Sequence, residues 1–364
     1  MNKSSFGSHF TVTTWGESHG KALGAVIDGC PAGLSLSEED IQKFLDRRKP
    51  GQSRYTTARK EGDLVEILSG VFEGKTTGTP ISLMVRNTDQ RSRDYGNIAY
   101  SYRPGHADYT FDAKYGFRDY RGGGRSSGRE TIGRVASGAV ASRLLASLGI
   151  SFCTYTKSIG PVSIKEYNPE EINNNAFYMP DADAAAKAGT YLEECMKNQD
   201  SAGGVIECRI SGVPAGLGNP VFEKLDAVLA QAVMSIGAVK AVEIGDGFQV
   251  SRMKGSEDND GFHTENGQIT KTSNHAGGIM GGISDGSEIV LRAAVKPTPS
   301  ISQPQNTVTK DGSELSLEIH GRHDPVIVPR AVVVVESMCA LTITDALFSN
   351  MTSRMDSIQK FYQK

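Results

Sequence analysis

The sequence lacks the marks of several protein classes. Its 364 residues include only five cysteines, and these are scattered without any Cys-x-x-Cys pair. An odd, scattered set disfavours a disulfide framework and a thiolate metal site, and it fits a reducing compartment. No apolar run approaches the length of a membrane span, and the N-terminal stretch has no apolar core of signal-peptide length. We therefore expect neither a membrane-spanning helix nor a secretory leader.

A strong net charge is also missing. The formal charge of −3 provides no general attraction to nucleic acid or to anionic membranes, so any anion site must arise from local clustering. Aromatic residues are not interleaved with the basic ones, which disfavours an RNA-binding module, although this stays the alternative for the basic loops. A hydrophobic fraction of 38% is typical of a soluble globular protein, and 41 glycines imply many tight turns.

Helical and strand-like patterns are interspersed without a regular βαβ rhythm. A helix is predicted after the N-cap Ser37, ending at Pro50-Gly51, and the apolar spacing predicts two further helices at about 129–148 and 221–237. The strand-like stretches are 239–248, 288–296 and 327–338, a helix start is expected at 342–348, and 164–191 resembles a surface excursion. We expect an α+β fold with a single domain over 1–364, because no clear linker divides the chain.

The stretch GGGRSSGRET, residues 122–131, combines bare backbone, hydroxyls and arginines before a predicted helix. A Walker A loop needs Lys and Ser/Thr where Arg129 and Glu130 stand, and the glycine spacing of a dinucleotide-binding loop is also wrong. Free N–H groups at a helix start, with Arg125 and Arg129 beside them, still favour an anion site. A glycine-rich surface turn with solvated arginines is the alternative.

Two histidines lie in glycine-flanked loops. His19 stands in GESHG, and His106 stands in RPGHAD beside Arg103. Imidazole is the side chain best suited to proton transfer near neutral pH, so both are candidate acid–base groups. A structural hydrogen-bonding role is the alternative for each.

Two other segments concentrate charge. Residues 46–60 carry six basic side chains around a turn, which predicts either a solvated face or a phosphate or carboxylate site. The segment 319–330 contains His320, Arg322, His323 and Asp324, but its Gly and Pro residues disfavour the helix that would align two histidine ligands on a metal. Several basic glycine-rich loops with few acids together suggest one deep pocket for polyanionic ligands.

Longer motifs make the sequence similar to a known family. GESHG, RRKPGQSR, NTDQRS, RPGHADYT, DYRGGGRSSGRE, MSIGAVK, EIGDGF, SNHAGGIMGGISDG, KPTPSI and GRHDP occur in this order between residues 16 and 325. The sequence closely resembles the chorismate synthase family, and the motifs span most of the chain.

This resemblance implies a specific chemistry. The family converts 5-enolpyruvylshikimate 3-phosphate to chorismate by anti-1,4-elimination of phosphate and the C6 hydrogen, in the pathway to aromatic amino acids. It requires reduced FMN without net redox change. The resemblance also implies a cytoplasmic homotetramer of a β-α-β sandwich type, with helices packed between antiparallel sheets.

The resemblance further implies roles for individual residues. His19 matches the acid for the departing phosphate, His106 the group near flavin N1, and Asp324 the acid that helps to take the proton. The matches for substrate binding are Arg48, Arg54, Arg103, Arg129 and Arg322. The matches for FMN binding are Arg125, Ser126, Ser127, Gly237, Ala238, Gly278, Lys296, Pro297, Thr298, Pro299, Ser300 and Arg322. No metal is implied.

Departures from the family pattern are small. Pro299 stands where many members have serine, which puts one hydroxyl contact to FMN in doubt, and Gly128 stands where alanine is common. The sequence shows no separate nicotinamide site of the kind that bifunctional members would need. We therefore expect an external flavin reductase as the source of reduced FMN.

Overall fold

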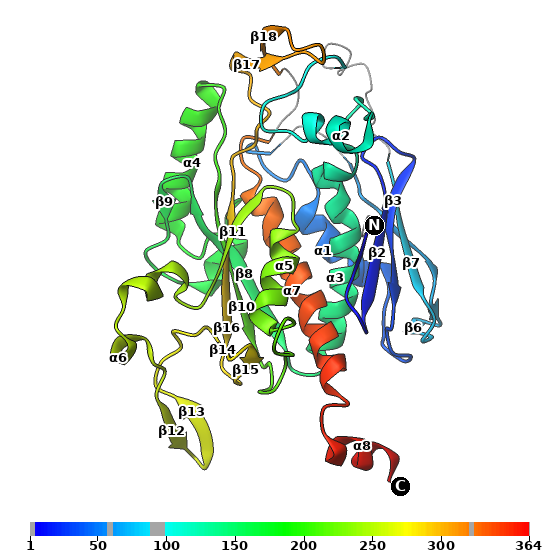
Figure 1. Ribbon diagram of the computed structural model, residues 1–364, viewed down its shortest axis with the longest axis vertical. Coiled ribbons are helices and arrows are strands. Elements are labelled where there is room, and N and C mark those ends of the chain that lie inside the picture. The colour runs from blue at the N-terminus through cyan, green and yellow to red at the C-terminus, as the bar shows by residue number, and fades with distance from the viewer. Residues whose placement is uncertain (1–3, 57–60, 88–98, 320–323, 364) are drawn as a thin grey trace.

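Two five-stranded antiparallel sheets lie on either side of a layer of helices (Figure 1). The structure is a computed structural model that describes residues 4–56, 61–87, 99–319 and 324–363. The first sheet has the order β1-β2-β3-β7-β4, formed by Ser5–Phe6, Thr11–Gly16, Ala22–Asp28, Ile81–Arg86 and Val65–Ser69. In β7, Ile81, Leu83 and Val85 are buried and alternate with more exposed residues, so one face of this sheet faces the core.

The second sheet has the order β11-β16-β10-β8-β9. Its strands are Val239–Ile244, Ile289–Val295, Gly204–Ser211, Ser151–Ile159 and Val162–Ser163. The strands predicted at 239–248 and 288–296 are thereby confirmed as β11 and β16. Along β16, Ile289, Leu291, Ala293 and Val295 are buried and alternate with partly exposed residues, as expected for a sheet with one face in the core.

Four helices fill the space between the sheets. They are α1 (Glu38–Arg48), α3 (Thr131–Ala146), α5 (Leu225–Met234) and α7 (Val328–Asn350). The first three confirm the predicted helices, and Ser37 caps α1 in a reciprocal pair of hydrogen bonds with Asp40. Helix α3 packs on β2 and β3 of the first sheet, whereas α7 packs on β8 and β10 of the second.

Helices α3 and α7 pack against each other at short range. A Cβ atom placed on Gly138 of α3 would lie 2.2 Å from the Cβ of Ser337 in α7. Only glycine allows the two backbones this approach, which is why α3 carries small residues along this side. The contact joins the two halves of the protein in a single hydrophobic core.

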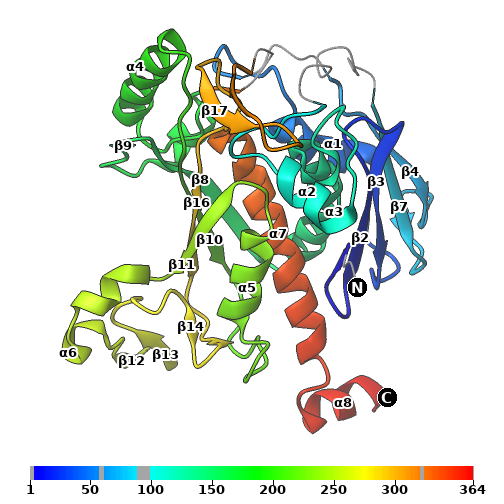
Figure 2. The ribbon, with the colours of Figure 1, turned by 45° about the horizontal axis from the view of Figure 1, so that its top comes forward.

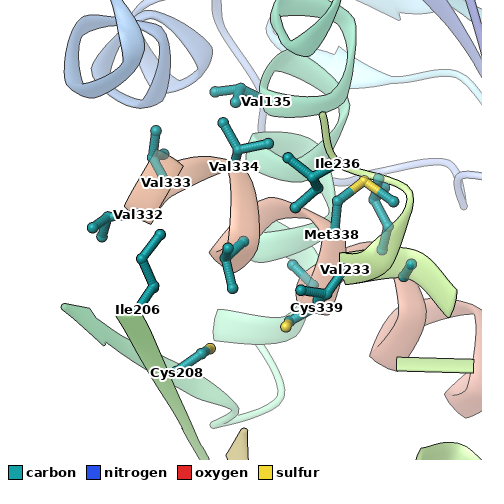
Figure 3. Close-up of a cluster of buried hydrophobic side chains, with 14 of the residues drawn as sticks. Val135, Ile206, Cys208, Val233, Ile236, Val332, Val333, Val334, Met338 and Cys339 are labelled. Atoms are coloured by element: carbon teal, nitrogen blue, oxygen red, sulfur yellow. The ribbon is translucent and has the colours of Figure 1, made fainter. Parts of the chain in front are cut away.

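The strand prediction for 327–338 is wrong, because these residues form the first half of α7, and the helix expected to begin at 342 is its continuation. Figure 3 shows Val332, Val333 and Val334 on this helix, near Ile206 of β10 and Val135 of α3. A helix buried on every side needs apolar residues all round, and this requirement outweighs the strand preference of β-branched residues. Helix α7 is also long and apolar enough to cross a membrane, but 78% of its most apolar window is buried inside the protein.

Smaller elements surround this framework. They are β5 (Val71–Phe72), β6 (Lys75–Thr76), β12 (Phe262–Glu265), β13 (Gln268–Lys271), β14 (Ile279–Met280), β15 (Ile283–Ser284), β17 (Gln305–Val308), β18 (Glu314–Leu317), α2 (Asp108–Tyr115), α4 (Ala182–Lys197), α6 (Gly255–Asp258) and α8 (Met355–Tyr362). The surface excursion predicted at 164–191 gives way to α4 at residue 182, where Asp181 accepts the backbone N–H of Ala184 as an N-cap. Figure 2 shows α2 and β17 on the same side of the molecule as the start of α3.

Candidate active site

Arg48 and Arg129 are joined by one buried carboxylate. The Nη2 atom of Arg48, at the end of α1, lies 2.6 Å from Asp63 Oδ2, and Arg129 Nη1, just before α3, lies 3.1 Å from Asp63 Oδ1. The side chain of Asp63 is fully buried, and Glu61 forms a second ion pair with Arg129. Arg48 also donates to the carbonyl of Gly128 at 3.1 Å. Two of the predicted anion-binding arginines are therefore held side by side.

The burial of Arg48 has an electrostatic cost. Burial lowers the pKa of its guanidinium, and the neighbouring charge of Asp63 opposes this effect. The Nε atom of Arg48 is buried without a hydrogen-bond partner among the described residues. A buried donor of this kind is rare in folded proteins, and a bound anion would satisfy it.

His19 lies directly against the glycine-rich loop. The turn 17–20 is closed by the Gly20 N–H, which donates to the Glu17 carbonyl at 3.0 Å. A Cβ atom on Gly122 would lie 2.1 Å from His19 Nδ1, so the loop backbone packs on the imidazole. Ser18 Oγ lies 3.1 Å from the same nitrogen. The GESHG and GGGRSS motifs, about 100 residues apart in sequence, thus meet at one place.

Asn87 connects this turn to Arg129. Its Oδ1 accepts a hydrogen bond from Arg129 Nε at 2.9 Å, and its Nδ2 donates to the carbonyls of Glu17 and Gly20 at 3.1 and 2.7 Å. Sequence reasoning missed both Asn87 and Asp63. The sequence singled out Asn87 only as the first residue of the NTDQRS motif, and nothing in the sequence distinguished Asp63.

The hydroxyls and the first arginine of the glycine-rich loop mainly hold the loop together. Arg125 donates to the Gly16 carbonyl at 3.1 Å and to Thr14 Oγ1 at 2.7 Å, both in β2. Ser126 Oγ donates to a carbonyl within the loop, and Ser127 Oγ accepts the Arg129 N–H at 3.3 Å. The loop therefore has a fixed shape immediately before α3.

His106 lies in the loop before α2, half-buried and hydrogen-bonded on both ring nitrogens. Its Nδ1 lies 2.9 Å from the Pro104 carbonyl, and its Nε2 lies 2.8 Å from Ser300 Oγ. A carbonyl only accepts, so Nδ1 carries the proton of the neutral ring and Ser300 donates to Nε2. Burial lowers the pKa of His106, and the charge of Arg103 lowers it further. The ring is thus neutral at neutral pH.

Arg103 is committed to an ion pair near His106. It donates two hydrogen bonds of 2.8 Å to the carboxylate of Asp108, at the start of α2. Both side chains are buried. This fork fixes the loop 103–108, and its cation lies close enough to affect His106.

The segment Lys296–Ser300 lies against the His106 loop. Lys296 Nζ donates to the Gly105 carbonyl at 2.8 Å, and its backbone N–H donates to Ala238, next to Gly237, at 2.9 Å. A Cβ atom on Gly105 would lie 2.7 Å from Pro299 Cβ. The predicted flavin residues of the MSIGAVK, RPGHADYT and KPTPSI motifs therefore converge.

Thr298 offers a test of whether these residues suit a flavin. Its Oγ1 is buried with no hydrogen-bond partner among the described residues, although its carbonyl accepts from Ser201 at 2.7 Å. An orphaned hydroxyl in the segment 296–300, whose Lys296 and Ser300 contact the His106 loop, suits the polar edge and the phosphate of FMN. The residues present fit the cofactor that the family resemblance implies.

Residues 324–330 connect the segment 296–300, where flavin contacts are predicted, to Arg48 of the arginine pair. Next to Ser201, Ala202 N–H donates to the Pro325 carbonyl at 2.8 Å. Arg330 Nη1 lies 2.5 Å from Asp324 Oδ2, and its Nε donates to the Arg48 carbonyl at 3.0 Å. Asp324 is therefore placed between the two groups of predicted residues.

Two predicted residues lie apart from the contacts described above, and a third lies outside the described residues. Arg54 is largely exposed and pairs with Glu193 of α4. Gly278 packs against Glu288 and Ile289 at the start of β16, whereas Lys296 follows the other end of that strand. The length of the strand separates the two residues by about 20 Å. Arg322, together with His320 and His323, lies outside the described residues.

Comparisons with known proteins agree with the motifs. The family described as chorismate synthase matches residues 10–348. Proteins named chorismate synthase from Agathobacter rectalis and Lachnoclostridium phytofermentans are 64% and 65% identical to this chain, each over the full length of both proteins. A solved structure titled "Crystal Structure of Chorismate Synthase" has a TM-score of 0.78 and 34% identity, covering 98% of this chain and 97% of that one.

Proposed function

The chain belongs to the chorismate synthase family, and we propose that the loops around Arg48, Arg129, His19 and His106 carry out the family's reaction. That reaction is the elimination of phosphate and the C6 hydrogen from 5-enolpyruvylshikimate 3-phosphate to give chorismate. The activity is that of a lyase in aromatic amino acid biosynthesis, and the family requires reduced flavin. The observation that carries the site assignment is the convergence of distant motifs around Asp63 and Gly122.

The substrate carries one phosphate and two carboxylates, so it needs several fixed cations. In our proposal Arg48 and Arg129 bind its anionic groups, because Asp63 and Glu61 hold both guanidiniums in place before the substrate arrives. Each charge-assisted contact contributes roughly 1.5–3 kcal/mol, and pre-ordered arginines lose little entropy on binding. Arg103 is committed to Asp108, so it stays a predicted substrate contact on the resemblance alone.

The phosphate leaves with the electrons of its C–O bond and needs a proton. His19 is the proposed acid, held by the turn 17–20 and by the backbone at Gly122. The C6 hydrogen must leave as well, and Asp324, which is paired with Arg330, is the residue proposed to help take its proton.

We propose FMN as the flavin, bound by Arg125 to Ser127, Gly237, Ala238 and Lys296 to Ser300. When bound there, reduced FMN would provide the transient electron that the elimination needs, without net redox change. His106, neutral and donating from Nδ1 to Pro104, would stand at the flavin ring, and Thr298 Oγ1 offers an unused hydrogen bond. Gly278 and Arg322 stay predicted contacts on the resemblance alone, as does Arg54 for the substrate.

An anaerobic assay with reduced FMN and 5-enolpyruvylshikimate 3-phosphate tests this function. We expect chorismate to form, followed by its absorbance, and we expect oxidised FMN to bind tightly only when the substrate is present. Tight binding of both ligands without any product would instead identify a flavin- or phosphate-binding protein that has kept the pocket and lost turnover.

The remaining family features complete the proposal. We propose a single domain whose two sheets and helical layer form the β-α-β sandwich of the family, a cytoplasmic location, and an external flavin reductase as the source of reduced FMN. We also propose a homotetramer, supported by the full-length similarity to family members. A monomer by light scattering at micromolar concentration would refute the oligomer.

A further inference from the structure

We infer that Asn87 is a positioning residue for the elimination, which keeps the turn bearing His19 in register with Arg129. Nothing in the family resemblance assigns it a role. The inference rests on the proposed functions of His19 and Arg129. It concerns a side chain that acts through these two residues and does not itself touch the reacting atoms.

Asn87 holds both ends of the turn. It follows directly after β7, and its Nδ2 donates to the carbonyls of Glu17 and Gly20, the residues on either side of Ser18 and His19. Its backbone N–H donates to the Lys21 carbonyl at 3.1 Å. A single asparagine therefore supplies three hydrogen bonds to the segment that carries the proposed proton donor.

The other atom of the same amide fixes Arg129. Asn87 Oδ1 accepts from Arg129 Nε at 2.9 Å, while Asp63 accepts from Arg129 Nη1. The guanidinium is thus fixed on one side to the protein core and on the other side to the His19 turn. Only a side-chain amide combines two N–H donors with a carbonyl acceptor, so aspartate cannot make this set of hydrogen bonds.

This connection matters because the two groups act on one ligand. An acid must lie within roughly 2.6–3.2 Å of the oxygen it protonates, and the position of that oxygen is set by the arginines that bind the substrate. A displacement of about 1 Å costs roughly 10²-fold in rate. Loss of Asn87 should therefore slow the chemical step without removing a substrate contact.

The test uses Asn87→Ala and the isosteric Asn87→Asp in the anaerobic assay with reduced FMN. Asn87→Asp keeps an acceptor for Arg129 but loses both donors to the turn. We expect kcat to fall by roughly 10²-fold in both variants, with a much smaller change in substrate affinity. If Asn87→Asp retains the wild-type kcat, the hydrogen bonds to the turn are dispensable and the inference is overturned. Should Asn87→Ala fail to fold, Asn87→Asp alone decides.

A double-mutant cycle separates this inference from the proposed function. If Asn87 acts through His19, adding Asn87→Ala to His19→Ala should cost little further rate. The same rate loss in both backgrounds would contradict the inference even if His19→Ala is slow. A fully active His19→Ala variant would instead refute the proposed role of His19.

Asn175 provides a matched control. Its Nδ2 also bridges two carbonyls, those of Glu171 and Met179, at 2.7 and 2.8 Å, but it lies in the segment before α4. Asn175→Ala should lower the melting temperature and leave kcat unchanged. A fall in kcat equal to that of Asn87→Ala would show that any lost asparagine bridge slows the enzyme, and would overturn the inference.

Discussion

His106 Nε2 lies 2.8 Å from the hydroxyl oxygen of Ser300, although 194 residues separate them in the chain. Since Nδ1 is engaged with the Pro104 carbonyl, the imidazole is held at both ends in its neutral form. This arrangement joins the RPGHADYT and KPTPSI motifs, and it explains how a histidine in a glycine-flanked loop keeps one orientation. Protonation of Nε2 in acid would break the hydrogen bond that Ser300 donates to it.

The first prediction concerns the stability of this region at low pH. Burial lowers the pKa of His106 below the usual value of about 6.5, so the unfolded chain binds its proton more readily. Stability linked to His106 is therefore full at neutral pH and is lost as the pH falls below about 6.5. We expect His106→Asn, which does not titrate, to lose less unfolding free energy between pH 7.5 and pH 5.5 than the wild type in urea unfolding.

His275 provides a control with the opposite sign. Its hydrogen bond to Asp246 raises its pKa, so its contribution is present at low pH and is lost as the pH rises through that pKa. His275→Asn should therefore make the protein relatively less stable in acid. Equal pH dependence in the wild type and in His106→Asn would contradict the placement of the buried neutral ring.

The second prediction uses the close contact between Gly122 and His19. An alanine at position 122 would place its Cβ 2.1 Å from Nδ1, so the imidazole must leave its position. We expect Gly122→Ala to lower kcat toward the level of His19→Ala, with a loss of roughly 10²–10⁴-fold. Circular dichroism should show an intact fold.

Gly128 is the matched control for this substitution. It lies in the same loop, and a Cβ atom there would have no neighbour within 4 Å. Gly128→Ala should keep the wild-type rate. If Gly122→Ala is equally active, His19 does not act from the position described.

The third prediction concerns Asp63, whose carboxylate neutralises Arg48 and Arg129. Removing one partner of a buried ion pair typically costs about 3–5 kcal/mol, because the remaining charge is left uncompensated. We expect Asp63→Asn to lower the unfolding free energy by this amount. Asparagine also tolerates the positive φ of 45° at this position, so the change isolates the charge.

An exposed pair shows what the burial of Asp63 contributes. Arg86 and Glu66 form an ion pair of 2.9 Å in which the side chains are 67% and 45% exposed. Glu66→Ala should cost at most about 1 kcal/mol. Inorganic phosphate should stabilise Asp63→Asn more than the wild type, since an anion can then neutralise the guanidiniums. A similar small cost for both variants would show that Asp63 does not hold the arginines.

The helix positions were largely predictable because their signals are local. The start of α1 depends on Ser37 and the acid three residues later, and both can be recognised in the sequence. The error at α7 has the opposite origin. Its valine run favours a strand when considered alone, and only burial between α3, α5 and the second sheet makes it a helix. Local preference does not contain this tertiary information.

The candidate site shows the same division. His19, His106 and the arginines could be selected by residue type and by their glycine-rich surroundings. Asp63 and Asn87 could not be assigned their roles, although Asn87 opens the NTDQRS motif, because these roles come from contacts with segments 15 to 70 residues away. Residues that position others are defined by non-local contacts, so they become visible only in the folded protein.

The last prediction concerns the division of work among the arginines. Arg48→Ala and Arg129→Ala should each weaken the binding of 5-enolpyruvylshikimate 3-phosphate by roughly 10–150-fold, because each removes a charge-assisted contact worth roughly 1.5–3 kcal/mol. FMN binding should change much less, since both side chains lie on the Asp63 side of the site. Calorimetric titration of each ligand provides the two affinities.

Arg54 decides whether this grouping is correct. The family resemblance assigns it to the substrate, whereas the structure pairs it with Glu193 of α4, and the Arg54 side chain is 71% exposed. An exposed cation interacts weakly through water and salt, so we expect Arg54→Ala to weaken substrate binding less than either buried arginine does. An equal or larger loss for Arg54→Ala would mean that the substrate extends across the segment 47–54 to α4. A loss of FMN affinity with intact substrate affinity in Arg48→Ala or Arg129→Ala would reverse the assignment of the two binding regions.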